Sequence, residues 1–200
     1  MAQQPDITNA ALMKIAASLV SDITENSEQA RKANAVFSRV ARRELRSHAW
    51  SFALARGSAA LLPDTPAFGY SYAYALPADC LRLVYVNGLY ADYSLRGAGD
   101  DITPPYAIEG RSLLTDLGAP VLLRYVKDVS SNLSIWDACF EEAFACALAV
   151  ELAIPLTKNI KLWEKAKAEY KDAIFQAKRC NAIELPSVDR MDSSWMTARR

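Results

Sequence analysis

The chain offers few residues of the kinds that catalyse reactions. Its single histidine, His48, stands two residues before Trp50, so a metal site that needs several imidazole ligands is excluded. A Cys–His or Ser–His–Asp nucleophile would have to use His48 itself, and no GxSxG motif surrounds a serine. We therefore predict that His48 is a capping or surface residue at the end of a helix.

Two pairs of neighbouring carboxylates are the other candidates for acid–base chemistry. Glu141 and Glu142 fall within a helical pattern, in which adjacent side chains point about 100° apart. Asp100 and Asp101 end a glycine-rich segment, which predicts a mobile loop tip with poor geometry for catalysis. A glycoside hydrolase needs two carboxyl groups at a set separation, and the sequence leaves open a pair that only the fold brings together.

Motifs for cofactors and metals are absent from the sequence. It contains no GxxxxGK[ST] phosphate loop, and its cysteines show no CxxC spacing. We expect the thiols to be small buried apolar groups, as free cysteines usually are; they are Cys80, Cys139, Cys146 and Cys180. The sequence thus predicts no catalytic, cofactor-binding or metal-binding residue, and a protein that is not an enzyme.

Basic residues recur along one face of a predicted helix. They are Lys32, Arg39, Arg43 and Arg46, with Arg31 and Arg42 nearby. Two interpretations stay open: a solvated face opposite the apolar stripe, or a cationic strip that contacts an acidic partner, a neighbouring subunit or passing DNA. We therefore keep Arg39, Arg43 and Arg46 as interface candidates.

Three tyrosines alternate with small residues at Tyr70, Tyr72 and Tyr74, so their rings share one face of a strand. Platforms that stack single-stranded nucleic acid interleave such rings with Arg or Lys. Between Gly69 and Cys80 there is neither. The row therefore predicts packing or a protein interface.

Composition indicates one globular unit. Of the 200 residues 52% are hydrophobic, and 23 basic residues balance 23 acidic ones, so net charge points to no class of partner. No apolar run approaches the roughly 20 residues that span a bilayer. The first ten residues lack the features of a signal peptide, so we expect synthesis in a cytoplasm.

Helical periodicity predicts four helices, two at each end of the chain. The first spans Ile7 to Leu19, and the second is capped by Ser27 and ends near Ser47. A capping box formed by Ser134 and Asp137 begins the third, which Pro155 closes. Thr157 is the expected cap of the fourth, whose stripe runs to Cys180.

Between these pairs the period changes to that of strands. The expected strands are Phe52 to Arg56, Ala59 to Leu62, Leu81 to Val86, Leu89 to Leu95, Tyr106 to Glu109, Ser112 to Thr115 and Val121 to Val126. Gly57 separates the first two, while Asn87-Gly88 and Gly110 mark hairpin turns.

The predicted fold class is α+β: a helical bundle of four helices from the two chain ends, with an inserted small β-rich domain. The predicted boundaries are 1–49 and 131–184 for the helices, 50–130 for the insertion and 185–200 for an extended tail. We expect Trp50 and Trp136 in the joint between bundle and β-layer.

Three blocks of the sequence resemble the head-to-tail adaptor family of short-tailed phages, also called tail tubular protein A. They are RRELRSHAWSFALARGSAAL, FGYSYAYALPADCLRLVYV and LLRYVKDVSSNLSIWDACFEEAFACALAVELAIPLT. The recurring elements are the Leu-Arg-x-His-x-Trp-x-Phe-Ala run at Leu45 to Ala53, the Tyr-x-Leu-Pro-x-Asp-Cys-Leu-Arg run at Tyr74 to Arg82, and Ile-Trp-Asp before the third helix. The likeness extends over roughly residues 7 to 184 in the family's order. Ala49 departs from it, since proline is commoner there.

The resemblance implies a structural virion protein of the bacteriophage tail or neck, made in the host cytoplasm. Such a protein assembles as a dodecameric ring that joins the portal to the tail nozzle. The ring surrounds a channel through which genomic DNA passes without sequence-specific binding. One alternative is a tail-associated hydrolase of peptidoglycan, because some tail accessory proteins in this position are linked to cell-wall hydrolysis. Another is an interaction module outside any virus.

The tail supplies the remaining interface candidates. Trp195 lies between Met191 and Met196 in a stretch too short to bury an indole by itself, and Arg199 and Arg200 end the chain. We predict that this segment gains order on a neighbouring subunit or on the portal, with Trp195 as the main contact.

Overall fold

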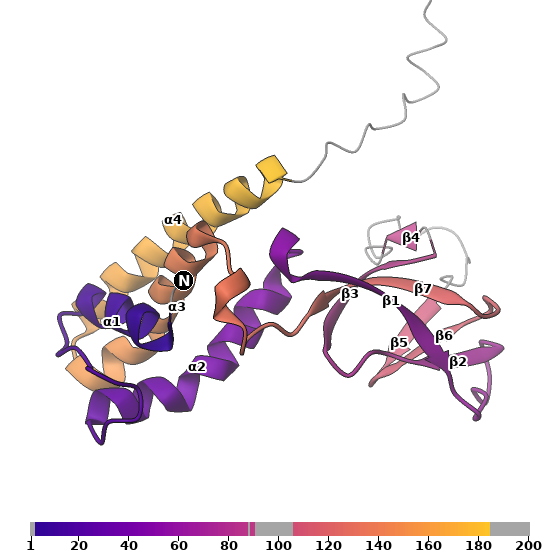
Figure 1. Ribbon diagram of the computed structural model, residues 1–200, viewed down its shortest axis with the longest axis horizontal. Coiled ribbons are helices and arrows are strands. Elements are labelled where there is room, and N and C mark those ends of the chain that lie inside the picture. Colours follow the sequence, from indigo (N-terminus) through magenta and orange to yellow (C-terminus); the bar gives the residue numbers. More distant parts are fainter. Residues whose placement is uncertain (1–2, 88, 91–105, 185–200) are drawn as a thin grey trace, which may run out of the picture.

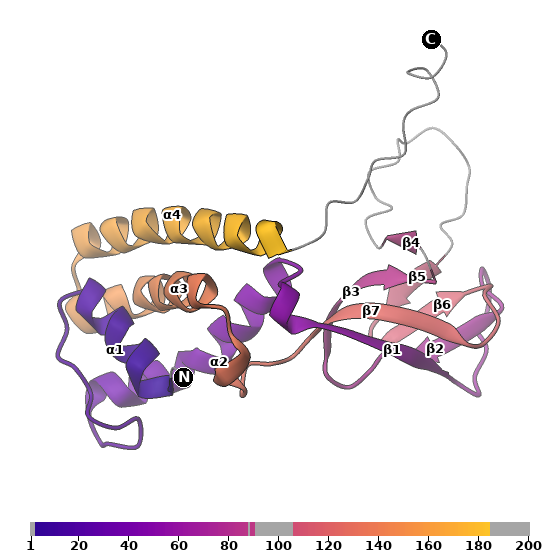
Figure 2. The same cartoon turned by 45° about the horizontal axis from the view of Figure 1, so that its top comes forward.

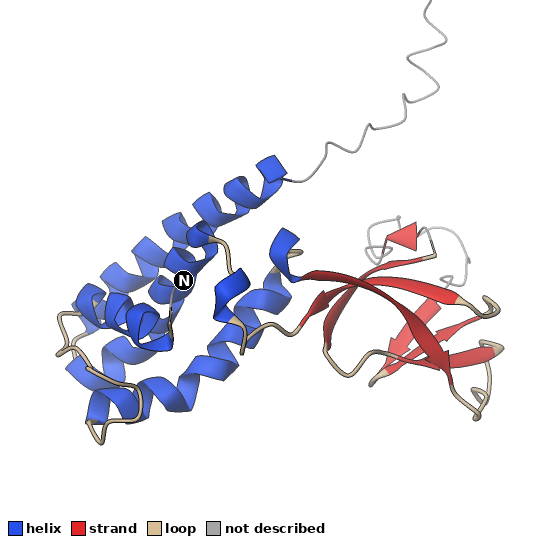
Figure 3. Ribbon diagram, in the orientation of Figure 1, coloured by secondary structure: helices blue, strands red, loops and turns tan. Residues whose placement is uncertain are grey.

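The computed structural model describes residues 3–87, 89–90 and 106–184 and has an α+β fold, as expected. Helices gather at one end of the long axis and strands at the other (Figures 1 and 3). The helices are α1 (Gln4–Lys14), α2 (Glu28–Ser47), α3 (Ala138–Thr157) and α4 (Ile160–Glu184). The strands, which lie between α2 and α3 in the sequence, are β1 (Leu54–Leu61), β2 (Tyr72–Ala75), β3 (Cys80–Val86), β4 (Leu89–Tyr90), β5 (Tyr106–Glu109), β6 (Ser112–Thr115) and β7 (Val121–Lys127).

The helical core forms around α3. This helix contacts α1, α2 and α4, and it lies between α4 and the other two (Figure 2). Its buried positions run right round the helix because many of them are alanines, which let neighbouring helices approach closely. Phe140 and Phe144 add aromatic contacts with Phe37 of α2 and with Trp136. No helix in the described ranges combines the length and the apolarity needed to cross a bilayer.

The start of α2 confirms its predicted cap, whereas the caps of α3 and α4 differ from prediction. Ser27 Oγ accepts from the Ala30 N–H across 3.1 Å. On α3, Asp137 itself is the N-cap, accepting from Cys139 and Phe140, so Ser134 and Asp137 do not form the expected capping box. Ser134 lies instead in a short 3₁₀ turn, where its hydroxyl donates to the side-chain oxygen of Asn132.

The junction of α3 and α4 also corrects two expectations. Pro155 does not end α3, which continues to Thr157 because a proline in the last turn removes few helical bonds. Thr157 donates backwards to the Ala153 carbonyl, and Asn159 caps α4 by accepting from the N–H groups of Lys161 and Leu162. The first helix is shorter than predicted and ends at Lys14.

The strands form one curled antiparallel sheet with the order β4-β3-β7-β1-β2-β6-β5. Both predicted hairpins are present: Val86 pairs with Leu89, and β5 pairs with β6 across Gly110, whose φ is +58°. The two strands expected on either side of Gly57 are one continuous strand, β1, because this residue keeps its place in the ladder opposite Leu123 of β7. The strand expected over Leu89 to Leu95 is described only as β4, and its remainder lies outside the described residues.

A second, smaller core fills the inside of the curled sheet. It is made by Tyr74, Leu83, Val86, Leu113, Val121, Leu123 and Tyr125, among others. The Tyr74 hydroxyl donates to the Leu117 carbonyl across 2.9 Å, so even the polar end of this buried ring is satisfied.

Two indoles close the joint between helices and sheet, as predicted. Trp50 precedes β1 and is 1% exposed, and Trp136 follows β7 and is 6% exposed. Each indole N–H donates to a backbone carbonyl across 3.0 Å, that of Glu44 for Trp50 and that of Val129 for Trp136. Both pack on Phe140 edge to face, so one ring of α3 supports the two connections that enter and leave the sheet.

Candidate functional site

The predicted cationic strip of α2 is held by partners within the chain. Glu151 of α3 accepts from Arg39 at 3.0 Å and from Arg43 at 2.5 Å. Burial opposes the charge of Arg43, but its hydrogen bonds to Glu151 and Glu44 outweigh that effect and raise its pKa. Glu151, the one polar residue in the apolar row of α3, therefore joins α3 to α2 through two ion pairs.

The other basic residues of α2 also bond within the chain. Lys32 reaches Glu28 and the Pro155 carbonyl, and Arg42 pairs with Asp128, just after β7, at 2.7 Å. Arg46 donates to the Leu81 carbonyl of β3 and so joins the helix to the sheet. Arg39, Arg42 and Arg43 keep more than half of their side chains exposed, so the strip is a solvated face whose cations are paired within the chain.

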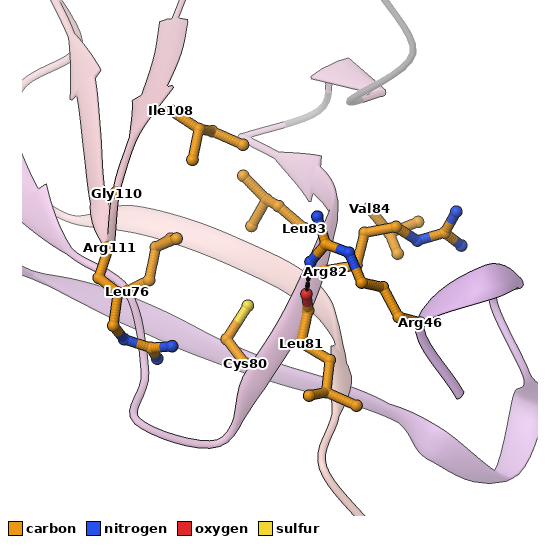
Figure 4. Close-up of a pocket in the computed structure, with 10 residues that line it drawn as sticks. All are labelled: Arg46, Leu76, Cys80, Leu81, Arg82, Leu83, Val84, Ile108, Gly110 and Arg111. Atoms are coloured by element: carbon orange, nitrogen blue, oxygen red, sulfur yellow. Dashed lines mark hydrogen bonds between the residues drawn. The ribbon is translucent and has the colours of Figure 1, made fainter. Parts of the chain in front are cut away.

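Arg46 also borders a hollow of about 560 Å³ between the end of α2 and the hairpin β5–β6. Arg46 and Arg111 approach it from opposite sides, with Cys80 between them (Figure 4). Leu76, Leu83 and Ile108 are among the apolar residues that line it. Arg111 donates to the Pro77 carbonyl at 2.5 Å, and Arg46 donates to the Leu81 carbonyl. Both arginines are therefore bonded to the backbone.

The thiol in this hollow is not an activated nucleophile. Burial raises the pKa of Cys80, and the nearby Arg111 and Arg46 lower it by less. A thiolate is the reactive form, so a raised pKa disfavours reaction at this sulfur.

His48 is the C-cap of α2 and contacts α4. Its Nε2 lies 3.1 Å from the amide nitrogen of Asn181, and its ring packs against Trp50. Burial lowers the pKa of His48, helped by Lys178 and Arg82. The predicted capping position is confirmed, and the lowered pKa favours the neutral ring.

Asn181 organises the turn around His48. It is buried, its Oδ1 accepts from the Ser51 N–H at 2.7 Å, and its amide donates to the Ala49 carbonyl at 3.3 Å. The end of α4 is thereby fixed to the chain that leaves α2. Sequence reasoning did not single out this asparagine, whose signal was its place directly after the apolar stripe that runs to Cys180.

Glu44 is a buried carboxylate that sequence reasoning also missed. It is 2% exposed, accepts from Tyr170 of α4 at 2.7 Å and pairs with Arg43 at 3.0 Å. Burial and the bond to Glu44 raise the pKa of Tyr170 well above its ordinary value. Each of the two side-chain oxygens of Glu44 therefore has its own hydrogen-bond donor.

The neighbouring carboxylates on α3 differ in their surroundings. Glu142 pairs with Lys14 of α1 at 2.6 Å, and burial raises the pKa of Glu141. Asp100 and Asp101 lie outside the described residues. Within the described ranges, no group of three or more His, Cys, Asp or Glu side chains is placed to hold a metal ion.

The thiols and the tyrosine row have packing roles. Cys80 and Cys146 are buried, while Cys139 and Cys180 are half-buried, so the expectation of four buried thiols holds for two of them. A hydrogen bond with Cys180 raises the pKa of Cys139 to about 11. Tyr74 is fully buried, Tyr72 beside it is 39% exposed, and Tyr70 lies before the strand.

Comparison with protein-family models finds no match for this chain, and comparison with curated proteins finds none either.

Two arginines lie opposite each other on neighbouring strands of the sheet. Arg56 of β1 and Arg124 of β7 are direct cross-strand neighbours, and neither has a hydrogen bond or ion pair with another described residue. They are far apart in the sequence, so only the register of β1 on β7 brings them together. Of the predicted interface candidates, Trp195, Met191, Met196, Arg199 and Arg200 lie outside the described residues.

Proposed function

We propose that the protein is the subunit of a head-to-tail adaptor ring in a short-tailed phage, joining the portal to the tail nozzle around a channel for DNA. The proposal rests on the likeness of the three sequence blocks to that family. It includes a dodecameric ring, a location in the virion and a structural role. The four helices would form the bundle through which neighbouring subunits meet.

The outer face of α4 is the observation that supports assembly. This helix has 25 residues, yet only Ala166, Ala177 and Asn181 are buried. Large apolar side chains stay exposed along it, namely Ile160 (65%), Phe175 (59%) and Ile183 (85%). We assign these three exposed side chains to the contact with a partner.

The charges of α4 favour a second copy of the chain as that partner. Basic and acidic residues are interspersed along the helix: Lys161, Glu164, Lys165, Lys167, Glu169, Lys171, Asp172, Lys178, Arg179 and Glu184. A surface with both signs in succession complements another surface of mixed sign, whereas a surface of one sign would repel its own copy.

Native mass spectrometry of the purified protein, alone and mixed with the portal of the same virus, tests this proposal. We expect a closed ring in complex with the portal. Replacing Phe175 by Glu should abolish the ring, because a charge would be buried at the contact. Phe68→Glu is the matched control, since Phe68 is 88% exposed in the loop between β1 and β2. A monomer that degrades peptidoglycan, losing that activity in Glu141→Gln or Glu142→Gln, would overturn the proposal in favour of the hydrolase.

Deletion of residues 187–200 tests the tail. We expect an unchanged far-ultraviolet circular dichroism spectrum and weaker attachment of the ring to the portal, because Trp195 would be lost as an anchor. Attachment of equal strength in the deleted protein would contradict a docking role for this segment.

A further inference from the structure

Arg56 and Arg124 stand apart from the other arginines of the described chain. Each of the others has a hydrogen bond, an ion pair, a ring contact or another electrostatic interaction within the chain. Arg56 of β1 lies directly opposite Arg124 of β7, and Arg124 lies opposite Tyr85 of β3 on its other side. The three side chains therefore form a row across neighbouring strands.

This arrangement costs stability in the absence of a ligand. Opposite residues of an antiparallel pair have Cα atoms about 5 Å apart, and like charges directly opposite each other repel. The row also lies on the outer face of the sheet, because the neighbours of Arg124 along β7, Leu123 and Tyr125, belong to the inner core. Nothing in the packing of that core requires two arginines here.

The row borders a hollow of about 680 Å³. Its described lining consists of Arg56, Gly57, Ser58, Tyr85, Leu122, Leu123 and Arg124, none of which is acidic. Two guanidinium groups, a hydroxyl and a phenol are all able to donate hydrogen bonds.

We propose that this row, Arg56, Arg124 and Tyr85, binds the phosphate groups of a nucleic-acid backbone without reading its sequence. Guanidinium groups bind phosphate oxygens by two parallel hydrogen bonds, and two adjacent forks match a chain that carries one charge at every nucleotide. A single carboxylate of a peptide would neutralise only one of them. The Tyr85 ring and Leu122 lie at the same hollow and offer apolar contact to sugars or bases. The site belongs to the sheet of one subunit, so it does not depend on ring assembly.

Fluorescence anisotropy of labelled oligonucleotides, single-stranded and duplex, of arbitrary sequence tests the proposal on the full-length protein. The double variant Arg56→Gln/Arg124→Gln should raise Kd by at least about 10-fold at low salt. It should also flatten the plot of log K against log salt by about 1.4 to 1.8, the effect of two lost phosphate contacts. Arg31→Gln/Arg179→Gln is the matched control, since it removes the same charge from exposed helical positions. Arg56→Lys/Arg124→Lys keeps the charge but loses the paired hydrogen bonds, so it should keep the wild-type salt slope and raise Kd by less than the Gln pair does.

Other outcomes would overturn the proposal. Equal Kd values for the double variant and the charge-matched control would show that these arginines are not the site. Competition by inorganic phosphate at the same concentration as oligonucleotide phosphate would assign the hollow to a free anion, and tighter binding of polyglutamate than of DNA would assign it to an acidic protein. Thermal unfolding decides whether the variant is folded: its melting temperature should equal or exceed that of the wild type, because repulsion is relieved.

Discussion

Replacing Tyr170 by Phe deletes the hydroxyl that donates to the buried Glu44 carboxylate across 2.7 Å. Hydrogen bonds to charged groups contribute about 1.5–3 kcal/mol. Because Tyr170 is only half-buried, we expect a loss of about 2 kcal/mol in the free energy of unfolding, toward the lower part of that range. For a chain of this length that loss corresponds to a fall of about 6 °C in Tm.

Urea unfolding followed by circular dichroism measures this change, and Tyr72→Phe is the control. Tyr72 is 39% exposed, so loss of its hydroxyl should change stability by less than about 0.5 kcal/mol. A double-mutant cycle with Glu44→Gln should give a coupling energy of about 1 kcal/mol. If Tyr170→Phe is no less stable than Tyr72→Phe, the buried carboxylate does not depend on this donor and the reasoning is refuted.

The same bond predicts a dependence on pH. The pKa of Tyr170 is raised in the folded state, so the folded protein retains the phenol proton when the unfolded chain has lost it. This contribution is complete below the ordinary tyrosine pKa of 10.0 and disappears as the pH rises beyond it. The difference in stability between wild type and Tyr170→Phe should therefore shrink above pH 10.

Three further predictions concern helix ends. Because the pKa of His48 is lowered from 6.5 in the folded protein, the unfolded chain binds the proton more tightly. The free energy of unfolding should therefore fall as the pH drops below 6.5. In urea titrations, His48→Gln should reduce the slope of the unfolding free energy against pH. Asn181→Ala should cost about 1–3 kcal/mol, since it leaves the Ser51 N–H without its acceptor; a loss no greater than that of an exposed substitution would contradict this role. Ser27→Ala and Asp137→Ala should each cost about 1 kcal/mol in thermal unfolding, and no loss would mean that neither side chain caps its helix.

Signals that act over a few residues allowed much of the fold to be predicted. The cap at Ser27 and the turns at Asn87 and Gly110 depend on local backbone geometry, and the helices and strands next to them were placed nearly to the residue. The alternation of periods along the chain was enough to give the α+β class. The burial of Trp50 at the joint followed from its place between a helical pattern and a strand pattern.

It was harder to predict which of several suitable residues caps a helix and whether a glycine ends a strand. Ser134 and Thr157 are good capping residues by type, yet Asp137 and Asn159 cap the helices because packing fixes where each helix begins. Gly57 was expected to break a strand, but β7 supplies a ladder partner on both sides of it. These outcomes depend on contacts between segments that are distant in the sequence.

The pairing of charged side chains was the feature least predictable from the sequence. Arg39 and Arg43 were noticed because they recur on one helix face, and the fold neutralises them with Glu151, a residue more than a hundred positions away. Arg56 and Arg124 were not noticed because nothing near either of them in the sequence is unusual, and only the register of β1 on β7 places them side by side. A run of cations on a helix can be paired by the helix that covers it, whereas cations that meet across the outer face of a sheet have no covering element to pair them. The second kind is therefore the better indicator of a ligand, and it becomes visible only when strand register is known.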